Sequence, residues 1–585
     1  MFAQISMWFV AAMLGQAPAD PAWLNSVPSD VDIVVRGRSV NTLQQDVIAM
    51  LKAMSPGLAE QASPAIDQLK AQVRQTAGDE LLNAGWAGLV RAVPGKPGGP
   101  PPITILIEGV DYAKLLKIAV DQHGIKAEPQ PDGFDKLNAP GDDNALYGFK
   151  GAGFIAVGTD QETIASFARL KESNFPSRLT PTARKAFLDG DLGVYVNVAQ
   201  LTTRYAPQMA QARQAMIGAF DANANANNGL AGPMVQFSKD FYGKIFDSSK
   251  DADVLTLNLD FDADGLALAT LLGVKPDSAL AKNIGSMQAG SPDFSSFSKD
   301  SALWMYSNMM PDELLRLQKL SFSMLASDFE KSPEFKAMEE GMRKLGRLKL
   351  LTAADYSDGM QSYSVVEVEN PQAYVDWMLK MQKSMMGSDS IMNFYKDAKI
   401  EPNAHSYKGI SYAGFTATID QEKMQKAMGA KPEAMEGVSA MFKDGKFANW
   451  TGIAGGKVIQ VMAPTWERAK DVIDANTNPE GGLAQSSAYK KVRARLTSEA
   501  SKFIVLSAQG FTKLIVKQLQ KTPNNQGIKV PDDLPAEPGL IGVSVTSRQP
   551  SAIEARLIFS SEAFPVFQKG LVPAFQALKP PQVNK

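Results

Sequence analysis

A recurring order of apolar segments constrains the fold of this chain most: a short strand, a helix, a hairpin and a second helix. Residues 31–35 (VDIVV) are predicted to form the first strand, because β-branched side chains dominate them. Residues 254–270 alternate apolar and polar side chains around Asp264 and Gly265, a pattern typical of a hairpin. Strands that arrive as hairpins beside helices indicate antiparallel sheets covered on one face by helices. The predicted fold class is therefore α+β.

Helix signals lie between the predicted strands. Asn41 is predicted to cap one helix, and Ser63 with Pro64 is predicted to start the next, since serine caps helices and proline suits a first turn. Residues 112–122 are predicted to form a helix that ends near Gly124.

The strand–helix–hairpin pattern occurs twice in the chain. The matching pairs of segments are residues 149–170 with 453–473, residues 191–201 with 501–511, and residues 254–270 with 540–559. This shared order predicts an internal duplication into two related halves. The predicted boundaries are residues 1–19 for an export signal, residues 20–290 for the first half and residues 296–580 for the second half.

Length and charge limit the classes of protein that fit. The 585 residues exceed what one hydrophobic core supports, so several domain-sized units are expected. The chain carries 60 Lys and Arg against 62 Asp and Glu, a net charge of −2, and contains no basic block. We therefore expect no nucleic acid as partner.

Two chemically useful residue types are scarce, because the chain has no cysteine and only His123 and His405 as histidines. Disulfides, cysteine nucleophiles and cysteine-ligated metals are thereby excluded. His123 precedes Gly124 and is predicted to lie at a helix end, where it meets terminal carbonyl groups. No GxSxG, Walker A or dinucleotide-binding glycine motif is present. The sequence therefore predicts no enzyme activity, no cofactor and no metal.

The N-terminus has the pattern of an export signal. Residues 5–15 are apolar, and Ala17-Pro18-Ala19 is a small-x-small cleavage pattern, although residues 1–4 contain no Lys or Arg. A buried N-terminal segment is the alternative interpretation. The apolar run is too short to span a membrane, and no later segment is long enough. We expect an exported protein of the periplasm or cell envelope, mature from about Asp20.

A family resemblance fits these features. Pro28, Ser29 and Asp30 lead into the strand at residues 31–35, hairpins recur, and an export signal comes first. In these respects the chain resembles large exported bacterial proteins of unknown function, built from repeated strand–helix–hairpin units. The resemblance implies a location in the cell envelope and supplies no active site.

Two groups of residues are candidates for binding. Trp377, Met378, Met381 and Met385 lie on a predicted helix and are interpreted as an apolar ligand-binding surface. An ordinary core stripe explains the same spacing, and thioethers that bind Cu(I) are a third interpretation. Asp260, Asp262 and Asp264 match the start of a calcium loop. Because Leu271 replaces the glutamate that such a loop needs, a hairpin turn explains these aspartates as well.

Three functions remain open from the sequence. The first is a non-enzymatic envelope protein that binds another envelope protein through a surface or groove. The second is a carrier or sensor that encloses a hydrophobic small molecule or lipid. The third is a hydrolase with a pair of carboxylates, which no motif supports. A carrier requires an interior apolar cavity, whereas an interaction protein requires an exposed apolar patch.

Overall fold

A computed structural model describes most of the chain. The described residues are 20–91, 101–141, 145–169, 175–226, 238–239, 242–244, 246–323, 333–356, 359–386, 395–420, 422–423, 445–478, 480, 482–521, 529–531, 534–535, 537–548 and 551–576. They fall into two compact units. The first is drawn from residues 1–209, 248–281 and 549–555, and the second from residues 210–247, 282–548 and 556–585.

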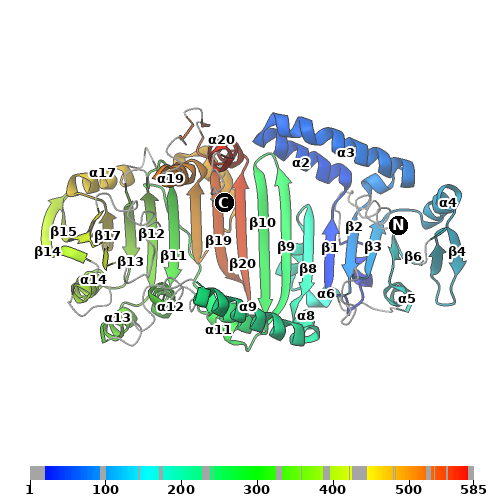
Figure 1. The fold of residues 1–585 in the computed structure, drawn as a ribbon, viewed down its shortest axis with the longest axis horizontal. Helices are drawn as coiled ribbons and strands as arrows, with labels where there is room; N and C mark the ends of the chain where they lie inside the picture. Colours follow the sequence, from blue (N-terminus) through cyan, green and yellow to red (C-terminus); the bar gives the residue numbers. More distant parts are fainter. Residues whose placement is uncertain are drawn as a thin grey trace. The chain divides into compact units, whose positions relative to one another are not determined.

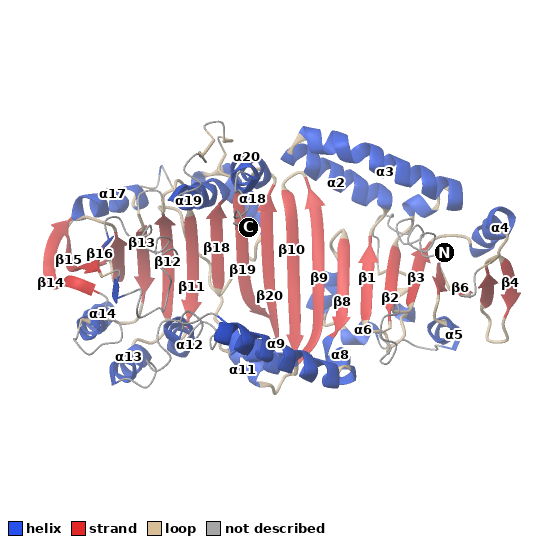
Figure 2. Cartoon of the chain, viewed as in Figure 1, coloured by secondary structure: helices blue, strands red, loops and turns tan. Residues whose placement is uncertain are grey.

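The strands are antiparallel in both units (Figures 1 and 2). In chain order, the first ones are β1 (Ile33–Gly37), β2 (Trp86–Val90), β3 (Ile103–Glu108), β4 (Lys126–Pro129), β5 (Asp135–Asn138), β6 (Leu146–Lys150), β7 (Phe154–Gly158), β8 (Leu192–Asn197), β9 (Ala252–Asp262) and β10 (Gly265–Val274). The later ones are β11 (Leu303–Met309), β12 (Leu348–Asp355), β13 (Gln361–Glu367), β14 (Tyr395–Tyr407), β15 (Ile410–Ile419), β16 (Lys446–Ala454), β17 (Lys457–Met462), β18 (Lys502–Ser507), β19 (Leu540–Arg548) and β20 (Ala552–Ser560).

Helices connect and cover these strands. In chain order they are α2 (Val40–Met54), α3 (Pro56–Ala77), α4 (Tyr112–His123), α5 (Gln161–Arg169), α6 (Phe175–Arg178), α7 (Pro181–Leu188), α8 (Val198–Arg204), α9 (Ala206–Ala226), α11 (Ala279–Gly285), α12 (Pro311–Ser323), α13 (Pro333–Arg343), α14 (Pro371–Met385), α17 (Trp466–Asn476), α18 (Ser487–Arg495), α19 (Ala508–Lys521) and α20 (Ala563–Gln576). Short 3₁₀ helices are η1 (Leu24–Ser26), η2 (Leu81–Asn83) and η6 (Leu483–Gln485). The predicted α+β class, with antiparallel sheets covered by helices, is confirmed.

Both units use one order of strands. In the first unit the order across the sheet is β4-β5-β6-β7-β3-β2-β1-β8-β9-β10. In the second unit it is β14-β15-β16-β17-β13-β12-β11-β18-β19-β20. Each strand of the first order therefore has a counterpart ten places later along the chain. The duplication itself stays a prediction.

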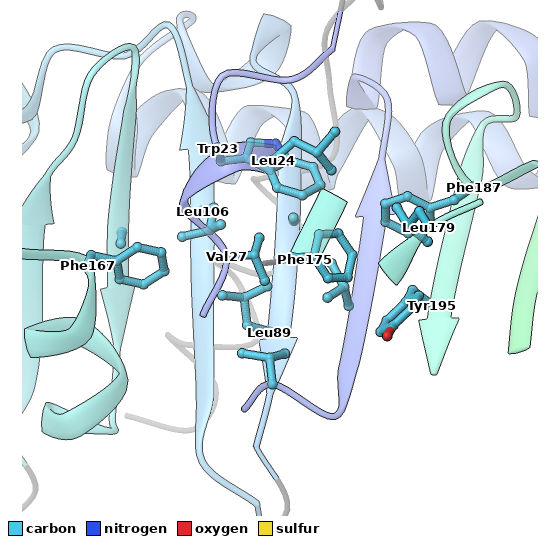
Figure 3. Close-up of a cluster of buried hydrophobic side chains, with 14 of the residues drawn as sticks. Trp23, Leu24, Val27, Leu89, Leu106, Phe167, Phe175, Leu179, Phe187 and Tyr195 are labelled. Carbon is cyan, nitrogen blue, oxygen red and sulfur yellow. The ribbon is translucent and has the colours of Figure 1, made fainter. Parts of the chain in front are cut away.

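Apolar residues cover both faces of the first sheet, whereas the sequence pattern indicated one. On β1, Val34 belongs to a core cluster that includes Trp23 of the N-terminal segment (Figure 3). The neighbouring Val35 points to the opposite face, because successive side chains of a strand alternate. There it packs against a second cluster, which includes Val73 of α3 and Leu115 of α4.

Two helix starts differ from the sequence prediction. Ser39, not Asn41, caps α2, because the Ser39 hydroxyl accepts a hydrogen bond from the Thr42 amide at 2.8 Å. Helix α3 begins at Pro56 rather than at Ser63, and Pro64 lies inside it. The Ser55–Pro56 pair provides the same serine–proline start, and it precedes the Ser63–Pro64 pair in the chain. Because Pro64 has no amide hydrogen, α3 continues through this position with one backbone hydrogen bond fewer.

Candidate functional site

An apolar pocket lies in the first unit, between α4 and the sheet. Its volume is about 70 Å³, and it is partly open to solvent. Ile105 of β3 and Val157 of β7 form its floor, and these two residues pair directly across the β3–β7 ladder. Because alternate residues of a strand share a face, Ile103 lies on the same floor. Apart from Tyr112, Gly158 and Thr159, the lining is aliphatic.

Helix α4 supplies the opposite wall of the pocket. Leu115, Leu116 and Ala119 line it, and their spacing places them on one helical face. The Asp111 carboxylate caps the helix by accepting a hydrogen bond from the Ala113 amide at 2.9 Å. The helix ends where Gly124 adopts a left-handed conformation, with φ of 65°. Local sequence therefore fixes both ends of the wall.

The aromatic residue of the pocket is held by a polar partner. The Tyr112 hydroxyl donates a hydrogen bond to Asp135 Oδ2 at 2.7 Å. Burial, together with the Asp135 carboxylate, raises the pKa of Tyr112 well above its ordinary value, so its hydroxyl stays protonated. A Cβ atom at Gly148 would lie 2.5 Å from the Tyr112 hydroxyl, so glycine leaves room for the ring. Tyr112 is therefore a fixed part of the wall.

The second unit has a helix at the position of α4. Helix α4 follows β3 after three residues, from Glu108 to Tyr112, and α14 follows β13 at the same spacing, from Glu367 to Pro371. This spacing matches Leu115 with Tyr374, and Ala119 with Met378. On the strands it matches Ile105 with Ser364 and, through the strand pairs, Val157 with Gln460.

Larger and polar side chains occupy this place in the second unit. Met378 is 5% exposed, and Gln460 Nε2 donates to its sulfur at 2.6 Å. The Tyr374 hydroxyl lies 3.5 Å from Gln460 Oε1, and burial raises the pKa of Tyr374 to about 12. The corresponding residues of the first unit, Leu115 and Ala119, are smaller than Tyr374 and Met378. The pocket is the space that they leave unfilled.

The predicted binding residues of the second unit lie on α14. Trp377 Nε1 donates to the Met338 carbonyl of α13 at 3.2 Å, and a Cβ atom at Gly341 would lie 2.3 Å from the Trp377 ring. Met378 packs toward β17, and Met381 is half-buried. The Met385 side chain lies outside the described residues. Trp377 and Met378 thus contact other parts of their own unit, and the apolar ligand-binding surface stays a prediction.

The three aspartates of the candidate calcium loop lie at the β9–β10 hairpin. Asp262 Oδ1 accepts hydrogen bonds from the Asp264 amide at 2.8 Å and the Gly265 amide at 3.1 Å. These bonds stabilise the turn by an Asx-type contact. Among the described residues, no group of three or more His, Cys, Asp or Glu side chains is placed to hold a metal ion.

The two histidines lie in different units and in different settings. His123 is the last residue of α4, directly before the left-handed Gly124. His405 lies on β14 and stacks on Trp466, with ring centroids 4.3 Å apart and an angle of 8° between the planes.

Two carboxyl groups of the first unit, one half-buried and one buried, have raised pKa values, and each accepts a hydrogen bond from a backbone amide. Burial raises the pKa of Glu108, whose Oε1 accepts a hydrogen bond from the Ala22 amide at 2.8 Å. Burial raises the pKa of Asp191 to about 6. Asp191 accepts hydrogen bonds from the Phe261 amide at 2.7 Å and from Arg38 at 3.2 Å. Both groups therefore already act as structural acceptors.

Asp191 gives a testable pH dependence of stability. Its side chain is 1% exposed, and its pKa of about 6 exceeds that of an unfolded aspartate. The folded state therefore binds the proton more tightly, so this stabilising contribution is complete at low pH and is lost as the pH rises toward and through about 6. Between about pH 4.5 and about pH 7.5, we expect wild type to lose about 2 kcal/mol relative to Asp191→Asn. Urea unfolding of both proteins at each pH measures this difference. Equal pH slopes would contradict the expectation.

Comparison with known proteins adds little. No protein-family model matches the chain, and no curated protein matches it. One solved structure, crystal form III of TP0453, aligns with 48% of this chain and 91% of its own, at 11% sequence identity and a TM-score of 0.21.

Within the described residues, no helix is both long and apolar enough to cross a membrane. Function is therefore inferred from this chain's own residues.

Proposed function

We propose that this is a non-enzymatic, exported cell-envelope protein, and that it acts as a carrier or sensor of a hydrophobic small molecule or lipid. The α4 pocket carries this proposal, because an apolar cavity is what such a protein requires. The matching place in the second unit contains Met378 and Tyr374, so the space beside Ala119 is not a necessary consequence of this strand order. Export rests on residues 5–19, which lie outside the described residues, and on the family resemblance.

A protein-interaction surface has less support. Large exposed apolar side chains among the described residues lie on separate parts of the chain; they are Val120, Tyr242, Met310, Ile504 and Val572. Single exposed apolar residues are ordinary on a protein surface, whereas a contiguous patch indicates a partner. The pocket therefore favours the carrier over the interaction protein.

Native mass spectrometry of the protein purified from its own host tests the proposal. We expect a chain mass that begins at about Asp20, together with a stoichiometric apolar compound that organic extraction recovers. A chain mass that includes residues 1–19 would overturn export. A ligand-free mass, combined with no uptake of added octanoic acid, would overturn the carrier function.

Substituting Ala119 tests whether the compound occupies this pocket. Ala119→Met adds three heavy atoms at the position that Met378 holds in the second unit, so we expect it to fill the pocket and abolish binding. Val120→Met is the matched control, because Val120 is on the same helix and 42% exposed. We expect the control to bind as wild type does. Urea unfolding shows whether both variants are folded, and binding by folded Ala119→Met would place the compound elsewhere.

A further inference from the structure

We propose that the α4 pocket takes the methyl end of an unbranched aliphatic chain, that the polar end of the ligand stays outside, and that Ala119 limits how far the chain enters. This inference rests on the proposed carrier function and names the class of ligand. It follows from the size of the pocket, from the aliphatic side chains that line it, and from the hydrogen bond that the Tyr112 hydroxyl already donates to Asp135.

The size of the pocket favours a chain over a ring. Its volume is about 70 Å³. An engineered apolar cavity that takes up benzene has a volume of about 150 Å³. The space in this pocket is about half of that volume, which favours a narrow group over a six-membered ring. An alkyl chain is narrower and enters one methylene at a time, so its end suits a space of this size.

The wall of the pocket favours a saturated chain. Its floor, Ile105 and Val157, and its opposite wall, Leu115 and Ala119, are aliphatic. Tyr112 supplies the aromatic ring of the lining, and its hydroxyl is fixed by Asp135. Flat aromatic ligands gain from stacking on a free ring face or from edge contacts with several rings. A wall of methyl and methylene groups instead gains from close contact with other methylene groups.

The polar end of the ligand is more stable in water than inside the pocket. Burying a polar or charged group without a hydrogen-bond partner costs free energy. The Tyr112 hydroxyl already donates its hydrogen to Asp135, so this group of the wall has no proton to offer a ligand carboxylate. The charge of Asp135 beside it also repels an anion. An amphiphile therefore enters with its methyl end first.

Ala119 limits the depth of entry because of its place in the wall. It is 6% exposed and lies one helical turn after Leu115 on the same face of α4. At the corresponding position of the second unit, Met378 extends to the Gln460 amide on β17. A longer side chain at residue 119 would thus cross the space between helix and sheet, and a ligand chain would lose that space.

A homologous series of ligands tests this inference on the full chain. Isothermal titration calorimetry with straight-chain acids from butanoic to dodecanoic acid measures the effect of each methylene. We expect the dissociation constant to fall about fourfold for each methylene that enters the pocket, and then to level off once the pocket is full. Octanoic acid should bind more tightly than phenylacetic acid, which has the same number of carbon atoms and the same carboxylate.

The variants locate the effect in the pocket. In Ala119→Met, the fall in the dissociation constant with chain length should disappear, whereas Val120→Met should keep it. Sedimentation with phosphatidylcholine vesicles separates two sources of the chain. Vesicle binding that Ala119→Met abolishes assigns the chain to a membrane lipid, and binding of the free acids alone assigns it to a soluble amphiphile.

The two proposals fail in different ways. Tighter binding of phenylacetic acid than of octanoic acid, or a dissociation constant independent of chain length, would overturn the aliphatic chain while leaving a carrier. A chain-length effect that persists in folded Ala119→Met would overturn the role of Ala119. If none of these acids binds and the purified protein carries no apolar compound, the carrier function itself fails.

Discussion

Replacing Trp23 with alanine is expected to lower the free energy of unfolding of the first unit by about 3–5 kcal/mol. The Trp23 side chain is 1% exposed, and its ring makes a T-shaped contact with the Phe187 ring, with centroids 6.5 Å apart. Leu24 and Val27 follow it into the same cluster (Figure 3). The loss is large because the rest of the core cannot collapse fully into the space of an indole ring. Urea unfolding followed by circular dichroism measures it.

A second, milder variant shows whether the loss of stability reflects the volume of the ring at residue 23. Trp23→Phe keeps a ring in the cluster, so we expect it to cost less than half of what Trp23→Ala costs. If Trp23→Ala instead costs less than about 1 kcal/mol, the segment around η1 would be leaving the sheet without unfolding it. That outcome would contradict the view that this segment is part of the first core.

Gly193 on β8 gives the second large expected effect. A Cβ atom at Gly193 would lie 2.0 Å from the Phe187 carbonyl oxygen, which belongs to the backbone and cannot rotate away. Alanine there must move either β8 or the end of α7. We expect Gly193→Ala to lower the free energy of unfolding by at least about 3 kcal/mol, because backbone shifts in a packed core are costly.

Gly273 on β10 is the matched control for this substitution. It also lies in a strand of the first unit, but the atoms nearest to its Cβ position are 3.7 Å away or farther, an ordinary contact. Gly273→Ala should therefore change the free energy of unfolding by less than about 1 kcal/mol. Similar losses for the two variants in urea titrations would show that the close approach at Gly193 has been relieved.

The elements of the fold that depend on local sequence were predictable. The hairpin predicted at residues 254–270 is β9 and β10, since Ala263 and Asp264 form a two-residue turn and Gly265 begins the return strand. The predicted helix at residues 112–122 is α4, with its end at Gly124. The start of α3 was not predicted, because two serine–proline pairs carry the same local signal.

The pocket was not predictable from the same kind of reasoning. Leu115 and Ala119 form an ordinary apolar stripe, and nothing near them in sequence shows that Ile105 and Val157 leave space opposite. That space depends on side-chain sizes across residues far apart in the chain. One usable signal was present, because aligning α4 with α14 by their preceding strands sets Ala119 against Met378. The sequence analysis placed its candidate binding residues on α14, the corresponding helix of the second unit.

The order of strands has a consequence for synthesis of the chain. The first strand, β1, lies inside the sheet and pairs with β2 on one side and β8 on the other, where Ile33 meets Val196. A ribosome adding about 5–20 residues per second leaves the β8 side of β1 bare for about 8–30 s. A longer wait, of about 10–40 s at the same rate, recurs at β11, where Leu303 meets Leu506 of β18. A bare internal edge can pair with other chains, so we expect the nascent chain to need a chaperone during both intervals.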